Sequence, residues 1–171
     1  MSERSRRRGL ELFDRASARD MHATPMQRPP KLDRPALEAM PEFSTGKGTV
    51  AKLLYGDPER GEEGGMSLVL AKFGAHFHLP RHSHSVDCLY YVLAGELHMG
   101  RRVVKAGDGF FVPAHAPYGY VAGPEGVEVL EFRAASAYDS QIHESPAGWA
   151  RILDAVRTHR AAWAEELAPY R

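Results

Sequence analysis

Residues 46–135 alternate short apolar runs with turn-forming residues, a pattern typical of β-strands. The turns are rich in Gly, Pro and Asp, as at Asp57-Pro58, Gly61–Gly65, Ala94-Gly95, Gly107–Gly109 and Gly123–Gly126. No amphipathic window of helix length interrupts the runs, which argues against a parallel α/β sheet. The expected strands are Thr49–Tyr55, Met66–Phe73, Leu89–Leu93, Glu96–Gly100, Gly109–Val112, Tyr118–Val121 and Val127–Phe132. We therefore expect an all-β sandwich or barrel over residues 46–135.

The two flanks of this region have different patterns. Residues 1–45 are expected to form an N-terminal arm, extended or partly disordered, with a short helix over Gly9–Arg19. The prolines from Pro25 to Pro41 break any longer helix there. At the other end, Ser145 is suited to cap a helix and Pro146 to occupy its first position. Apolar residues then recur at helical spacing, so we expect one amphipathic helix within residues 145–168.

Composition narrows the class of protein. Of 171 residues, 22 are Lys or Arg and 22 are Asp or Glu, and a zero net charge argues against broad nucleic-acid binding. The run Arg6–Arg8 is interpreted as a solvated tail. No run approaches about 18 apolar residues, so no membrane span is expected. The N-terminus lacks the apolar region of a secretory signal. These features predict a soluble, cytoplasmic protein.

Histidines are concentrated in one stretch, with His76, His78, His82 and His84 close together. Alternate residues of a strand share a face, so His82 and His84 are expected to point into the same space. Two converging neutral imidazoles are good ligands for Zn, Fe, Cu or Ni. His76 and His78 are interpreted as surface or rim residues.

The surrounding residues resemble the two motifs of the cupin superfamily, of the RmlC-like single-domain type. In the first motif, His82-x-His84 is followed at the family's spacing by Cys88 and Gly95. The second motif matches at Gly107 and Pro113. The resemblance covers roughly residues 66–133 and implies a double-stranded β-helix, or jelly roll, with the arm and the helix attached.

The family's usual metal ligands are only partly present. His82 and His84 match two of them, Cys88 occupies the position of the family's Glu, and Tyr118 that of its second-motif His. The resemblance thus implies a site for a divalent transition metal (Fe, Zn, Ni, Cu or Mn) on His82, His84 and Cys88, with Asp87 or Tyr118 as alternatives to Cys88. Cys88 is equally suited to be a small buried apolar residue.

The resemblance implies two kinds of function. One is a metal-dependent enzyme acting on a small organic molecule as a dioxygenase, lyase or isomerase, with Tyr118, His115 and Tyr120 as candidates for proton donors or substrate contacts. The other is a non-catalytic cupin that binds a small ligand or a metal as a sensor or accessory module.

Both faces of the expected strand Leu89–Leu93 are apolar, so both need to be covered. The helix, the arm or a second subunit could supply this cover, and we expect a homodimer.

Overall fold

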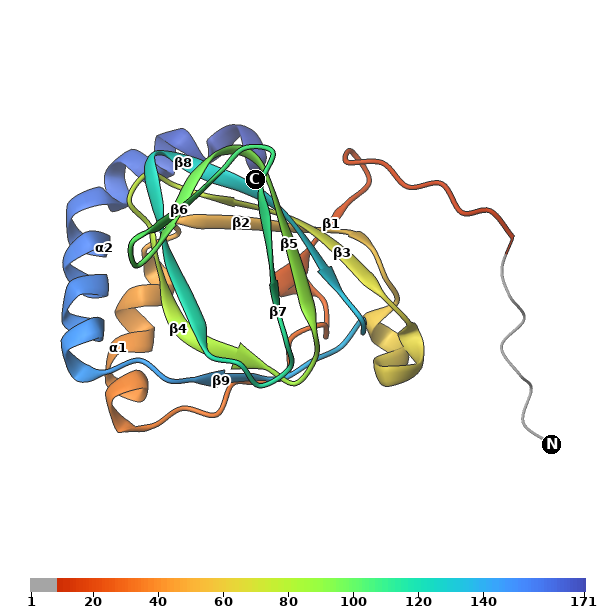
Figure 1. Ribbon diagram of the computed structural model, residues 1–171, viewed down its shortest axis with the longest axis horizontal. Helices are drawn as coiled ribbons and strands as arrows, with labels where there is room; N and C mark the ends of the chain where they lie inside the picture. Colours follow the sequence, from red (N-terminus) through yellow and green to blue (C-terminus); the bar gives the residue numbers. More distant parts are fainter. Residues whose placement is uncertain (1–8) are drawn as a thin grey trace.

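The computed structural model describes residues 9–171, apart from the side chain of Glu62, so that Arg6–Arg8 lies outside the described residues. Within this range nine strands form one curled antiparallel sheet (Figure 1). Its order is β1-β2-β3-β8-β4-β9, and β5 pairs with β6, β7 and β8. The strands are β1 (Arg19–Asp20), β2 (Thr49–Tyr55), β3 (Ser67–Phe73), β4 (His78–His84), β5 (Cys88–Met99), β6 (Arg102–Lys105), β7 (Gly109–Val112), β8 (Tyr118–Arg133) and β9 (Ser140–Ile142). The predicted all-β barrel is confirmed, with the curled sheet of a jelly roll.

Two of the expected turns are instead irregularities within long strands. Ala94-Gly95 lies inside β5, where the pairing with β8 shifts register on both sides. Gly95 has φ +71°, a conformation that glycine adopts without strain. Gly123–Gly126 lies inside β8, whose earlier residues pair with β4 and whose later residues pair with β3. Glycine-rich segments therefore mark bulges here as well as hairpin ends.

The expected N-terminal arm contains a helix, α1 (Arg34–Thr45). Asp33 caps it by accepting a hydrogen bond from the Ala36 amide at 3.0 Å, and Pro35 lies in the first turn, where proline is tolerated. Pro41 lies inside the helix. The short helix expected over Gly9–Arg19 is not formed; this segment ends in β1, which pairs with β2.

The expected C-terminal helix is confirmed as α2 (Pro146–Glu166), capped by Ser145. It packs beside α1 along one side of the barrel (Figure 1). Trp163 joins α2 to the sheet: it is 1% exposed, packs on Phe77, and donates a hydrogen bond from Nε1 to the Ala75 carbonyl at 2.8 Å. Three short 3-10 helices complete the described chain, at Met21–Ala23, Pro58–Gly64 and Ala168–Tyr170. None of the helices of residues 9–171 is both long and apolar enough to cross a membrane.

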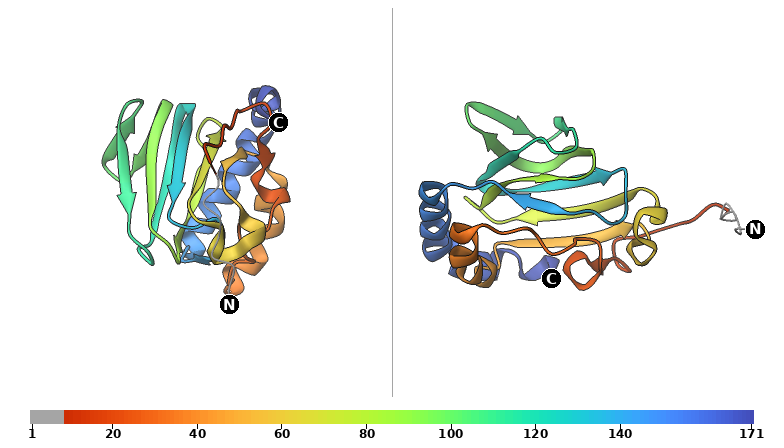
Figure 2. Two further views of the ribbon diagram at one scale, coloured as in Figure 1. Left: turned by 90° about the vertical axis from the view of Figure 1, so that its right-hand side faces the viewer. Right: turned by 90° about the horizontal axis from the view of Figure 1, so that it is seen from below.

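The outer face of β5 stays open in the described chain. Leu89, Tyr91 and Leu93 are 50%, 45% and 42% exposed. Both α-helices lie on the far side of the barrel from the β5–β7 layer (Figure 2). Neither helix therefore supplies the cover that the apolar pattern of this strand predicts.

Candidate functional site

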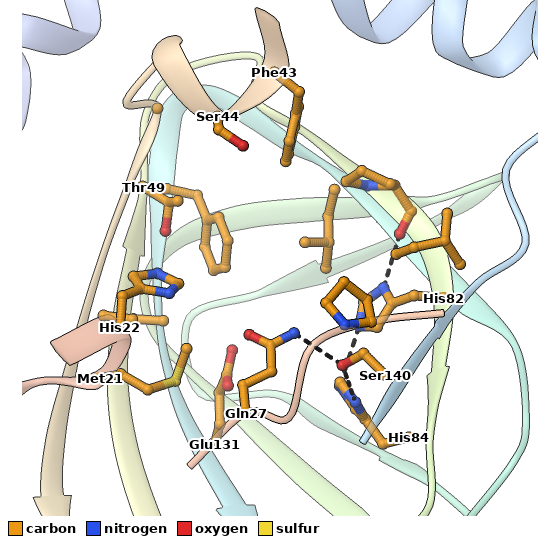
Figure 3. A pocket seen from close by; sticks show the side chains of 18 of the residues that line it. Met21, His22, Gln27, Phe43, Ser44, Thr49, His82, His84, Glu131 and Ser140 are labelled. Carbon is orange, nitrogen blue, oxygen red and sulfur yellow. Dashed lines mark hydrogen bonds between the residues drawn. The ribbon is translucent and has the colours of Figure 1, made fainter. Parts of the chain in front are cut away.

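A cavity of about 610 Å³ occupies the interior of the curled sheet. Strands β2, β3, β4, β8 and β9 contribute 13 of its 28 lining residues, and the segment from Met21 to Pro30 closes part of it (Figure 3). This segment is held to the residues before β9 by two backbone hydrogen bonds, from the Arg28 amide to the Tyr138 carbonyl and from the Tyr138 amide to the Met26 carbonyl, both 2.9 Å. The volume lies within the usual range for small-molecule sites, roughly 300–1,000 Å³.

His82 and His84 both project from β4 into this cavity, as their alternation predicts (Figure 3). Their exposed fractions are 8% and 6%, and their Nε2 atoms lie 3.1 Å apart. Burial lowers the pKa of His82 to about 4 and that of His84 to about 2, so both rings are neutral at pH 7. His82 Nδ1 donates to the Pro80 carbonyl at 2.8 Å, which leaves its Nε2 unprotonated, as a hydrogen-bond acceptor.

The orientation of His84 is set by a second layer of polar groups. Its Nδ1 lies 3.1 Å from Ser140 Oγ and 3.3 Å from the Asp139 carbonyl oxygen. Gln27, from the N-terminal segment, donates to Ser140 Oγ at 2.9 Å (Figure 3). Nδ1 thus has both a hydroxyl donor and a carbonyl acceptor within reach, and the ring is held in the same position in either neutral tautomer.

Tyr118 brings a hydroxyl to the same point from β8. Its oxygen lies 3.0 Å from His82 Nε2 and shares a short hydrogen bond with the Tyr90 hydroxyl of β5. Burial raises the pKa of both phenols well above their usual value. Hydrogen-bond contacts therefore link the four side chains, from Tyr90 through Tyr118 and His82 to His84.

A buried ion pair lies in the same cavity. Glu131 and Arg133, alternate residues of β8, are joined by a 2.5 Å contact between Oε2 and Nη2, with side chains 9% and 3% exposed. The Arg133 guanidinium stacks over the Tyr138 ring at 4.4 Å. Its Nε and Nη1 atoms have no hydrogen-bond partner among the described residues.

The donor set at the convergence point fits a transition-metal ion. Two nitrogen ligands held about 2.0–2.1 Å from one ion, at octahedral to tetrahedral angles, are separated by roughly 2.9–3.4 Å. The His82–His84 separation of 3.1 Å lies in this range, and so does the 3.0 Å from His82 Nε2 to the Tyr118 oxygen. Metal-bound histidines usually donate their other nitrogen's proton to a carbonyl or carboxylate, and both rings have such an acceptor beside Nδ1.

The predicted third ligand, Cys88, does not join the two histidines. Within residues 9–171, Glu62's side chain apart, no three His, Cys, Asp or Glu side chains are grouped to hold a metal ion. The Cys88 thiol is 1% exposed, does not line the cavity, and donates to the Val86 carbonyl at 3.6 Å. Burial raises its pKa, which disfavours the thiolate that a metal needs. Asp87 is exposed and accepts a hydrogen bond from the Ala114 amide at 2.8 Å.

The other two predicted catalytic residues lie outside the cavity wall. Tyr120 is buried against Phe73 and Phe110, and its hydroxyl has no partner among the described residues. His115 is exposed on the loop after β7, and its backbone amide donates to the His84 carbonyl at 2.7 Å. Through this hydrogen bond His115 supports the backbone at the end of β4.

Four residues of the site were not among the sequence candidates: Gln27, Glu131, Arg133 and Ser140. Strand alternation was a usable signal for two of them. Val127 and Val129 face the interior, so Glu131 and Arg133, two and four residues further on, face it too. No local pattern marks Gln27 or Ser140, which meet only in the fold.

No protein-family model and no curated protein sequence matches this chain. It is similar in structure to KdgF from Halomonas sp., with 25% identity over 51% of this chain and 79% of that one, at a TM-score of 0.43. An RmlC-like cupin from Shewanella frigidimarina matches with 26% identity over 52% and 77% of the two chains, at a TM-score of 0.45. The polyketide cyclase RemF from Streptomyces resistomycificus matches with 20% identity over 73% and 79%, at a TM-score of 0.49.

The architecture agrees with the sequence motifs. A curled antiparallel sheet encloses a cavity, the two first-motif histidines face into it from β4, and the residue at the second-motif ligand position, Tyr118, meets them from β8. The chain has the cupin fold.

Proposed function

We propose that this protein binds one transition-metal ion through His82, His84 and Tyr118 and acts on a small organic molecule in the adjoining cavity. The observation that carries the proposal is that His84 Nε2 and the Tyr118 oxygen lie 3.1 Å and 3.0 Å from His82 Nε2, and that all three side chains line the cavity. A bound ion would supply Lewis-acid or redox chemistry to a molecule in the cavity.

The residues of the site have separate tasks in this proposal. His82 presents a lone pair because its Nδ1 proton is engaged by the Pro80 carbonyl. His84 presents one when its Nδ1 donates to the Asp139 carbonyl, 3.3 Å away. Tyr118 is a neutral phenol in the metal-free protein and must lose its proton to become a strong ligand. Its hydrogen bond to the Tyr90 hydroxyl orients its oxygen toward the histidines.

Tyr90 remains as a proton-bearing group beside the proposed ligands. With His82 Nε2 and the Tyr118 oxygen bound to the ion, the Tyr90 hydroxyl would donate its hydrogen bond to the Tyr118 oxygen and so stabilise the ionised form of Tyr118. The cavity wall is mostly apolar, so a substrate with an apolar body would displace water from these groups.

The proposal is tested by metal loading. The full chain is reconstituted separately with Fe(II), Fe(III), Zn(II), Ni(II), Cu(II) and Mn(II), and retained metal is measured by plasma mass spectrometry. We expect near-stoichiometric retention of at least one metal, and loss of retention in His82→Gln/His84→Gln. Because tyrosinate bound to ferric iron absorbs visible light, the Fe(III) form is expected to be coloured.

The matched controls are two tyrosines of the same strand. Tyr118→Phe is expected to abolish the visible band, whereas Tyr120→Phe, buried but outside the cavity wall, is expected to keep it. Failure of every metal to bind the wild-type protein would refute the metal site. Retention of Fe(III) without a visible band would exclude Tyr118 as a ligand.

A second candidate function, a non-catalytic binding module, is favoured by one observation. Hydrogen-bond contacts link Tyr90, Tyr118, His82, His84 and Ser140 in sequence, so each of these polar groups has a protein partner. Stabilisation by small ligands in protein that retains no metal and turns nothing over would support this alternative.

A further inference from the structure

We infer that the molecule received by this cavity carries a carboxylate and that Arg133 binds it. The inference rests on the proposed role of the cavity as the ligand site and names the class of its ligand. It comes from the charged residues of the wall, which neither the motifs nor the metal donor set involve.

The Arg133 guanidinium is only partly satisfied by hydrogen bonds. Arg133 is 5% exposed, and one of its three nitrogens, Nη2, is engaged by Glu131. Nε and Nη1 are buried and have no partner in the described part of the chain. Unpaired N–H groups of a buried cation are costly, because they have lost their water without gaining an acceptor. A ligand oxygen reaching the guanidinium would supply the missing acceptor.

Arg133 is held in a fixed position on the cavity wall. Arg133 lines the same cavity as His82, His84 and Tyr118. Its guanidinium is stacked on the Tyr138 ring and tied to Glu131, so it is held in one place rather than free to turn away. A fixed, desolvated cation is better suited to bind an anion than a flexible surface lysine, because little side-chain entropy is lost on binding.

The cavity wall as a whole is rich in basic side chains. Four basic side chains line the cavity, namely Arg28, Lys47, Arg133 and Arg171, and Glu131 is the one acid among the described residues of the wall. Basic side chains thus outnumber acidic ones around a mostly apolar space. A cleft of one sign with low-dielectric walls attracts ligands of the opposite sign.

A carboxylate matches this arrangement better than a more highly charged group. Glu131 already offsets part of the charge of Arg133, so the guanidinium can balance one further negative charge. The apolar wall favours a hydrocarbon or aromatic body attached to that charge. The expected ligand class is therefore a small organic monocarboxylic acid.

The test compares matched acids and amides on the metal-free full chain. Metal is removed with 1,10-phenanthroline, which carries no carboxylate, and the buffer contains neither carboxylate nor phosphate. The probes are acetate and acetamide, benzoate and benzamide, and salicylate and salicylamide. Affinity is measured by calorimetric titration, and contact is monitored through the ¹H–¹⁵N resonance of Arg133 Nε–H. At least one acid is expected to bind about tenfold or more tightly than its amide and to shift that resonance.

Three variants separate Arg133 from the other cations. In Glu131→Gln the guanidinium loses its internal counter-charge, and the preference for acid over amide is expected to rise. In Glu131→Gln/Arg133→Met the preference is expected to disappear. Arg157→Met, which breaks an exposed ion pair between Arg157 of α2 and Glu42 of α1, is the control and should leave the preference unchanged.

The outcomes are decisive for this inference independently of the metal. No preference for an acid in any of the three pairs would overturn it, as would a preference that survives in the double variant. If the double variant fails to fold, the affinity rise in Glu131→Gln decides: equal or weaker acid binding there overturns the assignment to Arg133. A protein that binds no metal but shows the carboxylate preference would refute the metal site and leave this inference standing.

Discussion

The Glu131–Arg133 pair provides the sharpest stability prediction. Both side chains are nearly buried, and their charged groups are in direct contact at 2.5 Å. Glu131→Gln keeps the shape of the side chain and removes its charge, so the guanidinium stays buried without an anion. Breaking a buried pair from one side costs about 3–5 kcal/mol. Because the glutamine carbonyl can still accept from Nη2, we expect a loss at the lower end, about 3 kcal/mol.

Removing both charges should cost much less. Glu131→Gln/Arg133→Met leaves no buried charge, and methionine fills most of the space of the arginine stem. Replacing a buried pair by neutral groups of similar volume is often close to neutral, so we expect the double variant within about 1–2 kcal/mol of wild type. The two substitutions should therefore be strongly non-additive, with a coupling energy of roughly 2 kcal/mol or more.

The free energy of unfolding is measured by urea denaturation of the metal-free protein at pH 7.5. The buried Trp149 and Trp163 supply the fluorescence signal. A loss below about 1 kcal/mol in Glu131→Gln, or a double variant as unstable as that single variant, would refute the reasoning from a buried, uncompensated cation. A carboxylate probe at a hundred times its Kd should restore about 2.7 kcal/mol to Glu131→Gln, since binding to the folded state adds to stability.

Two further predictions concern the histidines and the open face of the sheet. The folded-state pKa values of His82 and His84, about 4 and about 2, lie below the unfolded value, so the unfolded chain takes up protons first as pH falls below about 6.5. Metal-free protein should lose up to about 2 kcal/mol per histidine by pH 5, and an equally steep loss in His82→Gln/His84→Gln would contradict this. Leu89 lies in register between Phe111 and Phe132, and all three are 41–58% exposed, each with roughly 80–120 Å² of apolar surface. Together with their exposed neighbours they offer an apolar area that approaches the smallest area buried in stable interfaces, so we expect a homodimer. Leu89→Asp should convert the dimer to a monomer, as measured by light scattering. A wild-type protein that is monomeric at about 100 μM would contradict this.

Strand positions were largely predictable, because alternation and turn chemistry are local. Thr49–Tyr55 and Gly109–Val112 were expected with the bounds that β2 and β7 have. The connection through Ala94-Gly95 is not predictable in this way, because a glycine with positive φ occurs in bulges as well as in hairpin turns. The pairing with the neighbouring strand decides between the two. The sequence does not predict helix α1, because proline usually breaks a helix, but Pro35 lies in the first turn, where its missing amide hydrogen is harmless.

In the candidate site, too, local signals predict some residues, whereas the positions of others depend on the folded sheet. The shared face of His82 and His84 follows from strand periodicity alone, and Tyr118 follows from the spacing of the second motif. Motif spacing also pointed to Cys88, but spacing along the chain fixes only a position on β5. Whether the side chain reaches the histidines depends on its length and on the curvature of the sheet, and the thiol stops short of the cavity wall.

The absence of a first-motif carboxylate connects the proposed metal site to the inferred ligand. The acid of the cavity wall, Glu131, comes from β8 rather than from the position of Cys88, and it is committed to Arg133. Two neutral imidazoles and one phenol therefore offer a divalent ion at most a single negative charge. In the described wall around them, basic side chains already outnumber acidic ones. Metal binding would deepen this excess, and a carboxylate on the incoming molecule would reduce it. Metal and carboxylate should accordingly bind with positive coupling, each raising the affinity of the other by the same factor.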